Sequence, residues 1–404
     1  MWDTPNIRDK ATGVAGTLPN VAPAGLLRAA DAAAAQLESV EDAAVHGRQR
    51  AARGRAYTYL ASYAAKKVAL ARAAARKHKA ITEGELDREA QRLSPWRDCG
   101  EPIGYYEKPK PEGGTRPITT FGYRRTALQI LVDDALKALG RRTAFDFARS
   151  GGGPMAVYNE VADLHAQGYI WFVTADIADC FGSLGHDGLK RVLPLPNTVV
   201  ETVIGNGRQG SAHSPDTGGD TGAHRDRPGR GIPQGAVCSS EVAGIAIGRV
   251  VEKVAPCGRA LLYGDDLLIP TASKSQAKVT RKALAQALAE DPVGPVGLRS
   301  AHVKDLQIKG VDFIGRRYEQ ASEFWGGFFR CRPSNKAFHR FMDRAARLGA
   351  NAHPEPRDEK IDIYASRWGK SFPNWHKPLP ADAMFVVTIQ RAKEKADNLA
   401  HQGT

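Results

Sequence analysis

The sequence has little cysteine and no long apolar run. Its five cysteines are scattered over 404 residues and never form a Cys-x-x-Cys pair, which argues against structural zinc and favours a reducing, cytoplasmic compartment. No run of about 18 apolar residues occurs, and the first residues, Met1 to Pro5, lack a signal-peptide core. We therefore expect no membrane insertion.

Acidic residues are also in short supply. The 57 lysines and arginines outnumber the 44 aspartates and glutamates, giving a net charge of +13. Such an excess favours a polyanionic partner, with nucleic acid first and a membrane surface second. The length predicts two or three domains.

The stretch 260–269 is the most informative part of the chain. Two short apolar runs flank Gly264-Asp265-Asp266, which predicts a tight β-hairpin with charge at its tip. Adjacent carboxylates between buried strands repel each other and resist desolvation. A divalent cation, Mg²⁺ or Mn²⁺, would neutralise them. The alternative is an ordinary Gly-Asp turn.

The amino-terminal part is expected to be helical and basic. Residues 1–20 predict a poorly ordered lead-in, and the Ala-rich stretch 24–93 predicts two or three helices. A dense basic block is either a solvated helix face or a phosphate-contacting surface; it comprises Lys66, Lys67, Arg72, Arg76, Lys77 and Lys79. Residues 105–118 predict a hairpin with cations near its tip, which either reach a triphosphate or form an exposed charged turn.

The remaining chain alternates predicted helices and strands. The apolar run 169–175 predicts a buried strand ending in Asp176, where a carboxylate is well placed to share a metal with the hairpin tip. Residues 205–230 are polar and Gly-rich and predict a loop or insertion. Helices are expected at 124–139, 155–166, 241–253 and 273–289, strands at 311–318 and 324–329, and a mostly helical end at 335–398 with Trp368 and Trp375 as packing anchors.

Four spaced motifs line up in order along this chain. They are Asp176-x4-Phe181, Pro233-Gln234-Gly235-x3-Ser239, Tyr263-Gly264-Asp265-Asp266 and Phe313-Ile314-Gly315. In that order they resemble the palm motifs of bacterial reverse transcriptases, the group that holds group II intron, retron and defence-associated enzymes. The resemblance extends upstream to Gly-Gly-Thr-Arg116-Pro-Ile and Ser150-x-Gly152, and covers roughly residues 100 to 330.

The resemblance implies an α+β right-hand polymerase with fingers, an antiparallel-sheet palm and a helical thumb. The expected parts are a helical basic extension (1–98), fingers (99–170), a palm (171–330) with the polar insertion 205–230, and a helical thumb (331–404). The implied activity is RNA-directed DNA polymerisation, in which a primer is extended with deoxynucleotides by two-metal phosphoryl transfer. RNA template and DNA product are the implied partners.

The resemblance also assigns roles to individual residues. Asp176, Asp265 and Asp266 match the metal-binding carboxylates for two Mg²⁺ ions, Ile177 belongs to the same metal set, and Lys304 matches the lysine that protonates pyrophosphate. Phe181 matches the steric gate against a ribose 2′-hydroxyl. The nucleotide-binding set also contains Gln234, Gly235, Lys110 and Arg116, and the primer grip is Phe313, Ile314 and Gly315.

Several alternatives stay open at this point. Ser240 replaces the usual proline after the Gln-Gly motif, and the retron signatures are missing, which favours a stand-alone defence-type enzyme with a dedicated RNA over a retron or group II intron type. An RNA-dependent RNA polymerase would also use Gly264-Asp265-Asp266, but the aromatic Phe181 opposes ribonucleotides. A catalytically silent nucleic-acid-binding subunit is the remaining alternative. The native template, the primer and the oligomeric state are left open.

Overall fold

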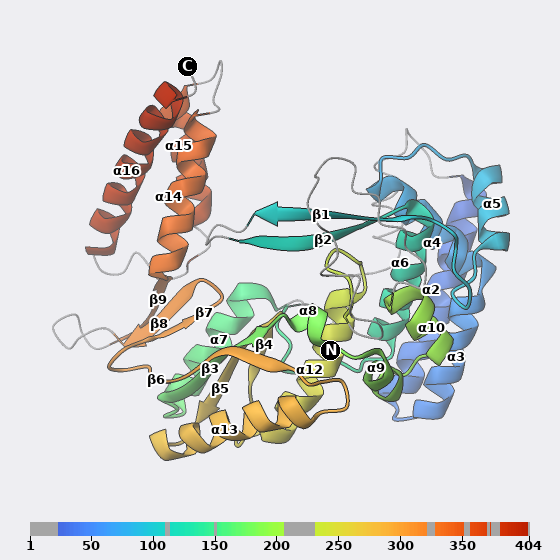
Figure 1. The fold of residues 1–404 in the computed structure, drawn as a ribbon, viewed down its shortest axis with the longest axis horizontal. Helices are drawn as coiled ribbons and strands as arrows, with labels where there is room; N and C mark the ends of the chain where they lie inside the picture. The colour runs from blue at the N-terminus through green and yellow to red at the C-terminus, as the bar shows by residue number, and fades with distance from the viewer. Residues whose placement is uncertain are drawn as a thin grey trace. The chain divides into compact units, whose positions relative to one another are not determined.

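The computed structural model describes residues 23–109, 114–148, 152–205, 231–320, 328–350, 356–369, 372 and 380–402. The chain divides into two compact units, each built from separate stretches of sequence (Figure 1). The first unit holds Met1–Asp146, Ile177–Val254 and Leu284–Leu298. The second holds Phe147–Asp176, Ala255–Ala283 and Arg299–Thr404. Most of the polar insertion, with Lys110, Ser150 and Trp375, lies outside the described residues.

Five helices form the main body of the first unit. They are α2 (Ala24–Val45), α3 (Gln49–Ala61), α4 (Tyr63–Arg76), α5 (Glu83–Arg92) and α6 (Tyr123–Ala138), and α2 packs against α3, α4 and α6. The sequence predicted two or three helices over 24–93, where the structure has four, α2 to α5. Local signals separate them: Ser62 caps α4, and Thr82 forms a capping box with Glu85 at the start of α5.

The basic block of α4 faces inward as well as outward, contrary to the sequence-based expectation of a wholly exposed face. Lys67 is only 4% exposed and its ammonium group lies 2.9 Å from Glu83. Arg72 is buried against α6, with Nη2 3.3 Å from Asp134 Oδ1, and the same carboxylate accepts a 3.1 Å hydrogen bond from Tyr59. Both alternatives for the block are wrong for these two cations, because carboxylates distant in sequence pair with them.

A long β-hairpin and several short helices complete the first unit. Strands β1 (Ile103–Pro109) and β2 (Thr115–Phe121) pair antiparallel from Ile103↔Phe121 to Pro109↔Thr115, which confirms the predicted hairpin. Its tip, 110–113, lies outside the described residues. The short elements are α8 (Cys180–Ser183), α9 (His186–Val192), α10 (Asn197–Val199), the π-helix η1 (Val200–Ile204) and the longer α12 (Ser239–Val254).

The second unit is organised by a four-stranded sheet in the order β4-β5-β3-β6 (Figure 1). The strands are β3 (Trp171–Ala178), β4 (Leu261–Tyr263), β5 (Asp266–Thr271) and β6 (Gly297–Asp305). Strand β3 pairs antiparallel with β5 from Trp171↔Thr271 to Asp176↔Asp266. The predicted strand before Asp176 and the predicted Gly-Asp-Asp hairpin are both confirmed, whereas β6 was not anticipated.

A second, three-stranded sheet packs its apolar side into the core of the same unit. Its strands β7 (Val311–Phe313), β8 (Arg316–Gln320) and β9 (Phe329–Pro333) contribute to a core with α7 (Gly153–Ala166) and β3. The prediction of one strand over 311–318 is wrong. Ile314 and Gly315 have φ of +47° and +76°, so the chain turns back in a two-residue loop between Phe313 and Arg316.

Helices fill the rest of the second unit, as the sequence predicts. Helix α13 (Lys274–Glu290), of which Lys274–Ala283 belongs to this unit, follows β5. Helices α14 (Asn335–Ala350), α15 (Arg357–Gly369) and α16 (Pro380–Gln402) pack side by side. Phe341 stacks on Tyr364 and contacts Trp368, with ring centroids 5.4 Å and 4.5 Å away. Within the described ranges, none of the helices has the length and apolar character needed to cross a membrane.

Candidate active site

Strand register places two of the predicted carboxylates side by side. Asp176 of β3 is paired directly with Asp266 of β5, so both side chains leave the same face of the sheet with Cβ atoms about 5 Å apart. Gly264 and Asp265 form the two-residue loop that joins β4 to β5. Gly264 has φ of +68°, as the first position of a type II′ turn requires. Asp265 therefore stands at the tip, next to the pair.

The hairpin is anchored at its base. Arg259 lies just before β4 and contacts three side chains of helix α7 and its end: Nε is 2.8 Å from Glu160, Nη2 is 2.7 Å from Asp163 and Nη1 is 2.9 Å from Gln167. The main-chain N–H of Phe147 donates to the carbonyl oxygen of Leu262 at 2.9 Å. Because the apolar residues of β4 and β5 are also buried, the carboxylates start from a rigid support.

The three carboxylates share one electrostatic environment. Burial, together with the negative charges of Asp265 and Asp176, raises the pKa of Asp266 to about 6. Lys336 and Arg340 of α14 oppose this rise. Carboxylate oxygens are the hard donors that Mg²⁺ and Mn²⁺ prefer, so the donor chemistry and the concentrated negative charge fit divalent cations.

A cation of the protein already contacts this group. Arg299 of β6 places Nη1 3.3 Å from Asp176 Oδ2, and the two side chains are 58% and 30% exposed. In the part of the chain that the structure describes, no three His, Cys, Asp or Glu side chains converge closely enough to form a ready-made ion site. Because both side chains are partly exposed, this ion pair is weak.

Two other members of the expected catalytic set are placed differently. The N–H of Leu306 bonds the carbonyl of Ile170 at 2.9 Å, while Arg299 lies at Asp176, so β6 runs antiparallel to β3. Lys304 therefore lies about 13 Å along the sheet from Asp176. The Ile177 side chain is fully buried, which leaves only its main chain for a metal.

The nucleotide-binding loop predicted around Gln234 belongs to the first unit and is fixed on strand β2. The N–H of Thr119 donates to the carbonyl of Gln234 at 2.7 Å. Gly235 has φ of +108°, and a Cβ there would lie 2.6 Å from the carbonyl oxygen of Thr119. Ser239 Oγ donates to the Pro233 carbonyl at 2.8 Å and closes the turn. The loop thus needs glycine for both its conformation and its close approach.

Phe181 and Arg116 belong to the same unit as this loop. Phe181 lies on α8, and its carbonyl accepts a 2.8 Å hydrogen bond from the N–H of Ile232 at the start of the loop. Arg116 is exposed on β2, three residues before Thr119. Gln234 Oε1 is buried and accepts no hydrogen bond from the described residues. The structure therefore groups Phe181, Gln234, Gly235 and Arg116 in one unit and the three carboxylates in the other.

The ordered motifs coincide with a known family. A family model described as reverse transcriptase (RNA-dependent DNA polymerase) matches residues 108–315, just over half of the chain. The chain belongs to the reverse transcriptase family. All the candidate site residues named above fall inside the matched range except Lys336 and Arg340.

Among solved structures, this reverse transcriptase is similar to telomerase from Candida albicans, determined in complex with the TWJ fragment of telomeric RNA. The TM-score is 0.42 and the sequence identity 10%, over 76% of this chain. This chain spans 61% of the telomerase chain. No curated protein matches the sequence.

The expected primer grip of this reverse transcriptase lies at one end of the three-stranded sheet. Phe313 is buried in the core, and the carbonyl of Gly315 accepts a 3.0 Å hydrogen bond from the N–H of Ser334. Ile314 adopts a left-handed conformation that is strained for a β-branched residue. Such strain persists only where the surroundings hold it, and it is found preferentially at functional turns.

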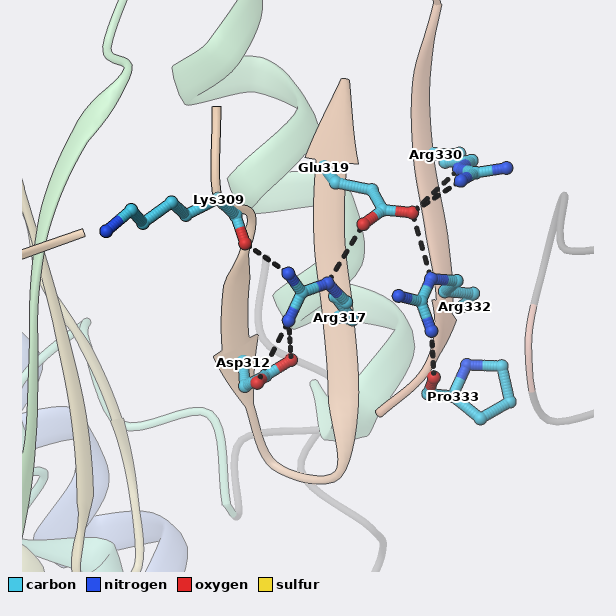
Figure 2. A network of polar contacts seen from close by, with 7 residues as sticks. All are labelled: Lys309, Asp312, Arg317, Glu319, Arg330, Arg332 and Pro333. Carbon is cyan, nitrogen blue, oxygen red and sulfur yellow. Dashed lines mark hydrogen bonds and ion pairs between the residues drawn. The ribbon is translucent and has the colours of Figure 1, made fainter. Parts of the chain in front are cut away.

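The solvent-facing side of that sheet carries a network of arginines around one carboxylate (Figure 2). Glu319 Oε2 lies 2.9 Å from Arg317 Nε, and Glu319 Oε1 lies 2.9 Å from the Nε atoms of both Arg330 and Arg332. Asp312 contacts Arg317 from the neighbouring strand at 3.3 Å. Burial by itself would raise the pKa of Glu319, but the hydrogen bonds and charges of these arginines outweigh it and lower the pKa.

Arg299, Arg259 and Glu319 are absent from the residues that the sequence suggested. Each acts through partners on other strands or helices, so spacing along the chain carries no signal for them. Only the family motifs, which are local, were visible in the sequence of this reverse transcriptase.

Proposed function

We propose that this protein is an RNA-directed DNA polymerase that extends a primer with deoxynucleoside triphosphates. The observation that carries the proposal is the register of Asp176 against Asp266, with Asp265 at the adjoining hairpin tip. Membership of the reverse transcriptase family supports it independently.

Each group of residues has a defined task in this proposal. Asp176, Asp265 and Asp266 would hold two divalent ions, Mg²⁺ or Mn²⁺; the chemistry that such ions supply when bound is activation of the primer 3′-hydroxyl and stabilisation of the pyrophosphate. Arg299 holds Asp176 in place until the carboxylate is exchanged onto a metal. Lys336 and Arg340 temper the negative charge at Asp266.

Another group of residues has the task of recognising the nucleotide. Arg116 binds the triphosphate, Gln234 and Gly235 line the nascent base pair, and Phe181 excludes the 2′-hydroxyl of a ribonucleotide by a direct clash. Lys110, which shares the triphosphate in this proposal, lies outside the described residues.

A primer-extension assay tests the chemistry. Purified protein, Mg²⁺, a primed RNA template and labelled deoxynucleotides are combined, with Asp265→Asn as the inactive variant. A metal ion is worth several kcal/mol of transition-state stabilisation, so we expect a loss of about 10³-fold. The control is Asp362→Asn on α15 of the same unit, where the carboxylate side chain is 55% exposed. This variant should leave the rate unchanged. Equal rates for wild type and Asp265→Asn would refute the assignment.

Sugar selection separates this function from RNA polymerisation. Phe181→Ala should allow ribonucleotides to be incorporated while deoxynucleotide incorporation continues, because the clash with the 2′-hydroxyl is removed. The ratio of kcat/KM for the two nucleotides measures it. If the variant still rejects ribonucleotides as strongly as wild type does, Phe181 is not the gate.

We further propose that the enzyme copies a dedicated RNA in bacterial antiviral defence rather than acting as a retron or group II intron enzyme. The support is the basic helical region that precedes the matched range and the missing retron signatures. Sequencing the nucleic acid that co-purifies with the protein tests this. One abundant RNA species supports the proposal, and a random sample of cellular RNA contradicts it.

A further inference from the structure

Helix α3 presents an exposed face that combines cations with an aromatic ring. Arg50, Arg53 and Tyr57 are spaced by three and four residues, so they follow one another along a single side of the helix. Both arginines are exposed, and Tyr57 is 36% exposed although most of the large side chains of this unit are buried. None of the three belongs to the range matched by the reverse transcriptase family.

The other arginines around α3 are already neutralised. Arg48 Nη2 lies 2.6 Å from Asp42 Oδ2, and Arg55 Nη1 donates to the Ser39 carbonyl at 2.7 Å and lies 3.7 Å from the same aspartate. Within the described ranges, Arg50 and Arg53 make no ion pair and no hydrogen bond. The acidic group nearest in sequence is thus used by their neighbours.

A second cation, Arg141, lies just beyond α6, the helix that packs against α3, and has no partner in the described part of the chain. Burial lowers the pKa of Arg141, and the positive charge of Arg53 lowers it further. The Nε atom of Arg141 is buried and has no hydrogen-bond partner among the described residues. Two guanidinium groups held near each other without a carboxylate repel, and an anion placed at both would relieve the repulsion.

We propose that Arg53 and Arg141, flanked by Arg50 and Tyr57, form a binding site for the phosphodiester backbone of RNA. Guanidinium groups recognise phosphate in bidentate fashion, and an exposed tyrosine offers a stacking surface for an unpaired base. The site lies in the helical part of the first unit and is separate from the residues proposed for chemistry. It deepens the proposed function by giving the dedicated RNA a place on the protein, and its test is independent of polymerisation.

The test measures RNA binding by the full-length protein without nucleotides. The probe is an RNA hairpin with a single-stranded tail, and its dissociation constant is measured over a range of NaCl concentrations. Each phosphate contact contributes about 0.7 to 0.9 to the slope of log K against log salt. Arg53→Gln with Arg141→Gln should therefore lower the slope by about 1 to 2 and weaken binding at low salt.

A matched variant separates this site from general charge. Arg48→Gln removes one positive charge at the start of the same helix, as Arg53→Gln alone does within it, but Arg48 is already paired with Asp42. We expect its slope and affinity to equal those of wild type. Equal losses in Arg48→Gln and in the double variant would overturn the proposal, and so would wild-type binding in the double variant.

Two further readouts address folding and the ligand. Since Arg53 and Arg141 repel, Arg53→Gln should have a Tm no lower than wild type even though it binds RNA less well; a fall in both would mean that Arg53 is structural. Tyr57→Ala should weaken binding of the tailed hairpin about fivefold or more while Tyr57→Phe does not, because stacking needs only the ring. A DNA hairpin of the same sequence shows whether the site binds RNA alone or phosphodiesters of either kind. If the salt slope of the double variant equals that of wild type with both probes, the proposal is overturned.

Discussion

Glu319 offers a quantitative test of how the second unit is held together. One carboxylate, 13% exposed, receives hydrogen bonds from three arginines that are 21% to 28% exposed (Figure 2). A hydrogen bond to a charged group contributes about 1.5–3 kcal/mol. In Glu319→Gln the amide nitrogen would meet guanidinium donors, while the other oxygen still accepts. Because the arginines can turn partly toward water, we expect a loss of about 2–4 kcal/mol rather than the full sum.

The loss should depend on pH in a defined direction. The arginines lower the pKa of Glu319 in the folded protein, so its contribution is complete above the ordinary glutamate pKa of about 4.3. As the pH falls through the folded pKa, the carboxylate is protonated and the contribution disappears. The difference between wild type and Glu319→Gln should therefore be constant from about pH 8 to pH 5.5 and shrink in acid.

Urea denaturation of both proteins at several pH values measures this difference. Glu394→Gln, at an exposed position on α16, is the control and should change stability by less than about 0.5 kcal/mol. The reasoning is refuted if Glu319→Gln unfolds at the wild-type urea concentration at pH 7. It also fails if the stability difference persists unchanged where the carboxylate is protonated.

Two other substitutions test the first unit. Arg72→Met should lower the free energy of unfolding, measured by urea denaturation, by about 3–5 kcal/mol, because it leaves the buried Asp134 without its cation. Adding Asp134→Leu should recover most of that loss. If it does not, the ion pair itself is strongly stabilising. Gly235→Ala should raise the KM for deoxynucleotides about tenfold, since its Cβ would meet the Thr119 carbonyl. Gly47→Ala, also at a positive φ but in open space, should leave KM unchanged; equal KM values for the two variants would show that the loop adapts.

The sequence predicted those features that local patterns encode. The short continuous apolar run before Asp176 is typical of a buried strand, and Gly-Asp-Asp is typical of a hairpin turn. The structure pairs these strands antiparallel, as expected. The helical spacing of 124–139 and 241–253 likewise agrees with α6 and α12 to within a few residues. Periodicity and turn chemistry act over a few residues, so they can be read without the fold.

The sequence did not predict contacts between residues that lie far apart in the chain. Lys67 and Arg72 looked like part of a solvated or phosphate-binding face, but their carboxylates lie on α5 and α6. Arg299 contacts Asp176 only because β6 pairs with β3, and no spacing of residues in the sequence predicts that pairing. The turn at Ile314 was hidden for a different reason, since a β-branched residue is a poor indicator of a left-handed conformation.

Because the strand register pairs Asp176 with Asp266, the site depends on the exact number of residues in each strand. In a pleated strand, every second residue faces the same side of the sheet. The two carboxylates therefore meet only because an even number of positions separates each of them from the other residues of its strand that face that side. A single residue inserted among the five residues of β3 that precede Asp176 would leave composition and hydropathy almost unchanged. It would nevertheless turn either the core residues or the carboxylate to the wrong side of the sheet. Insertions of two residues would restore the facing but shift the pairing along the ladder. The number of residues in this strand is therefore constrained more tightly than the identity of its side chains.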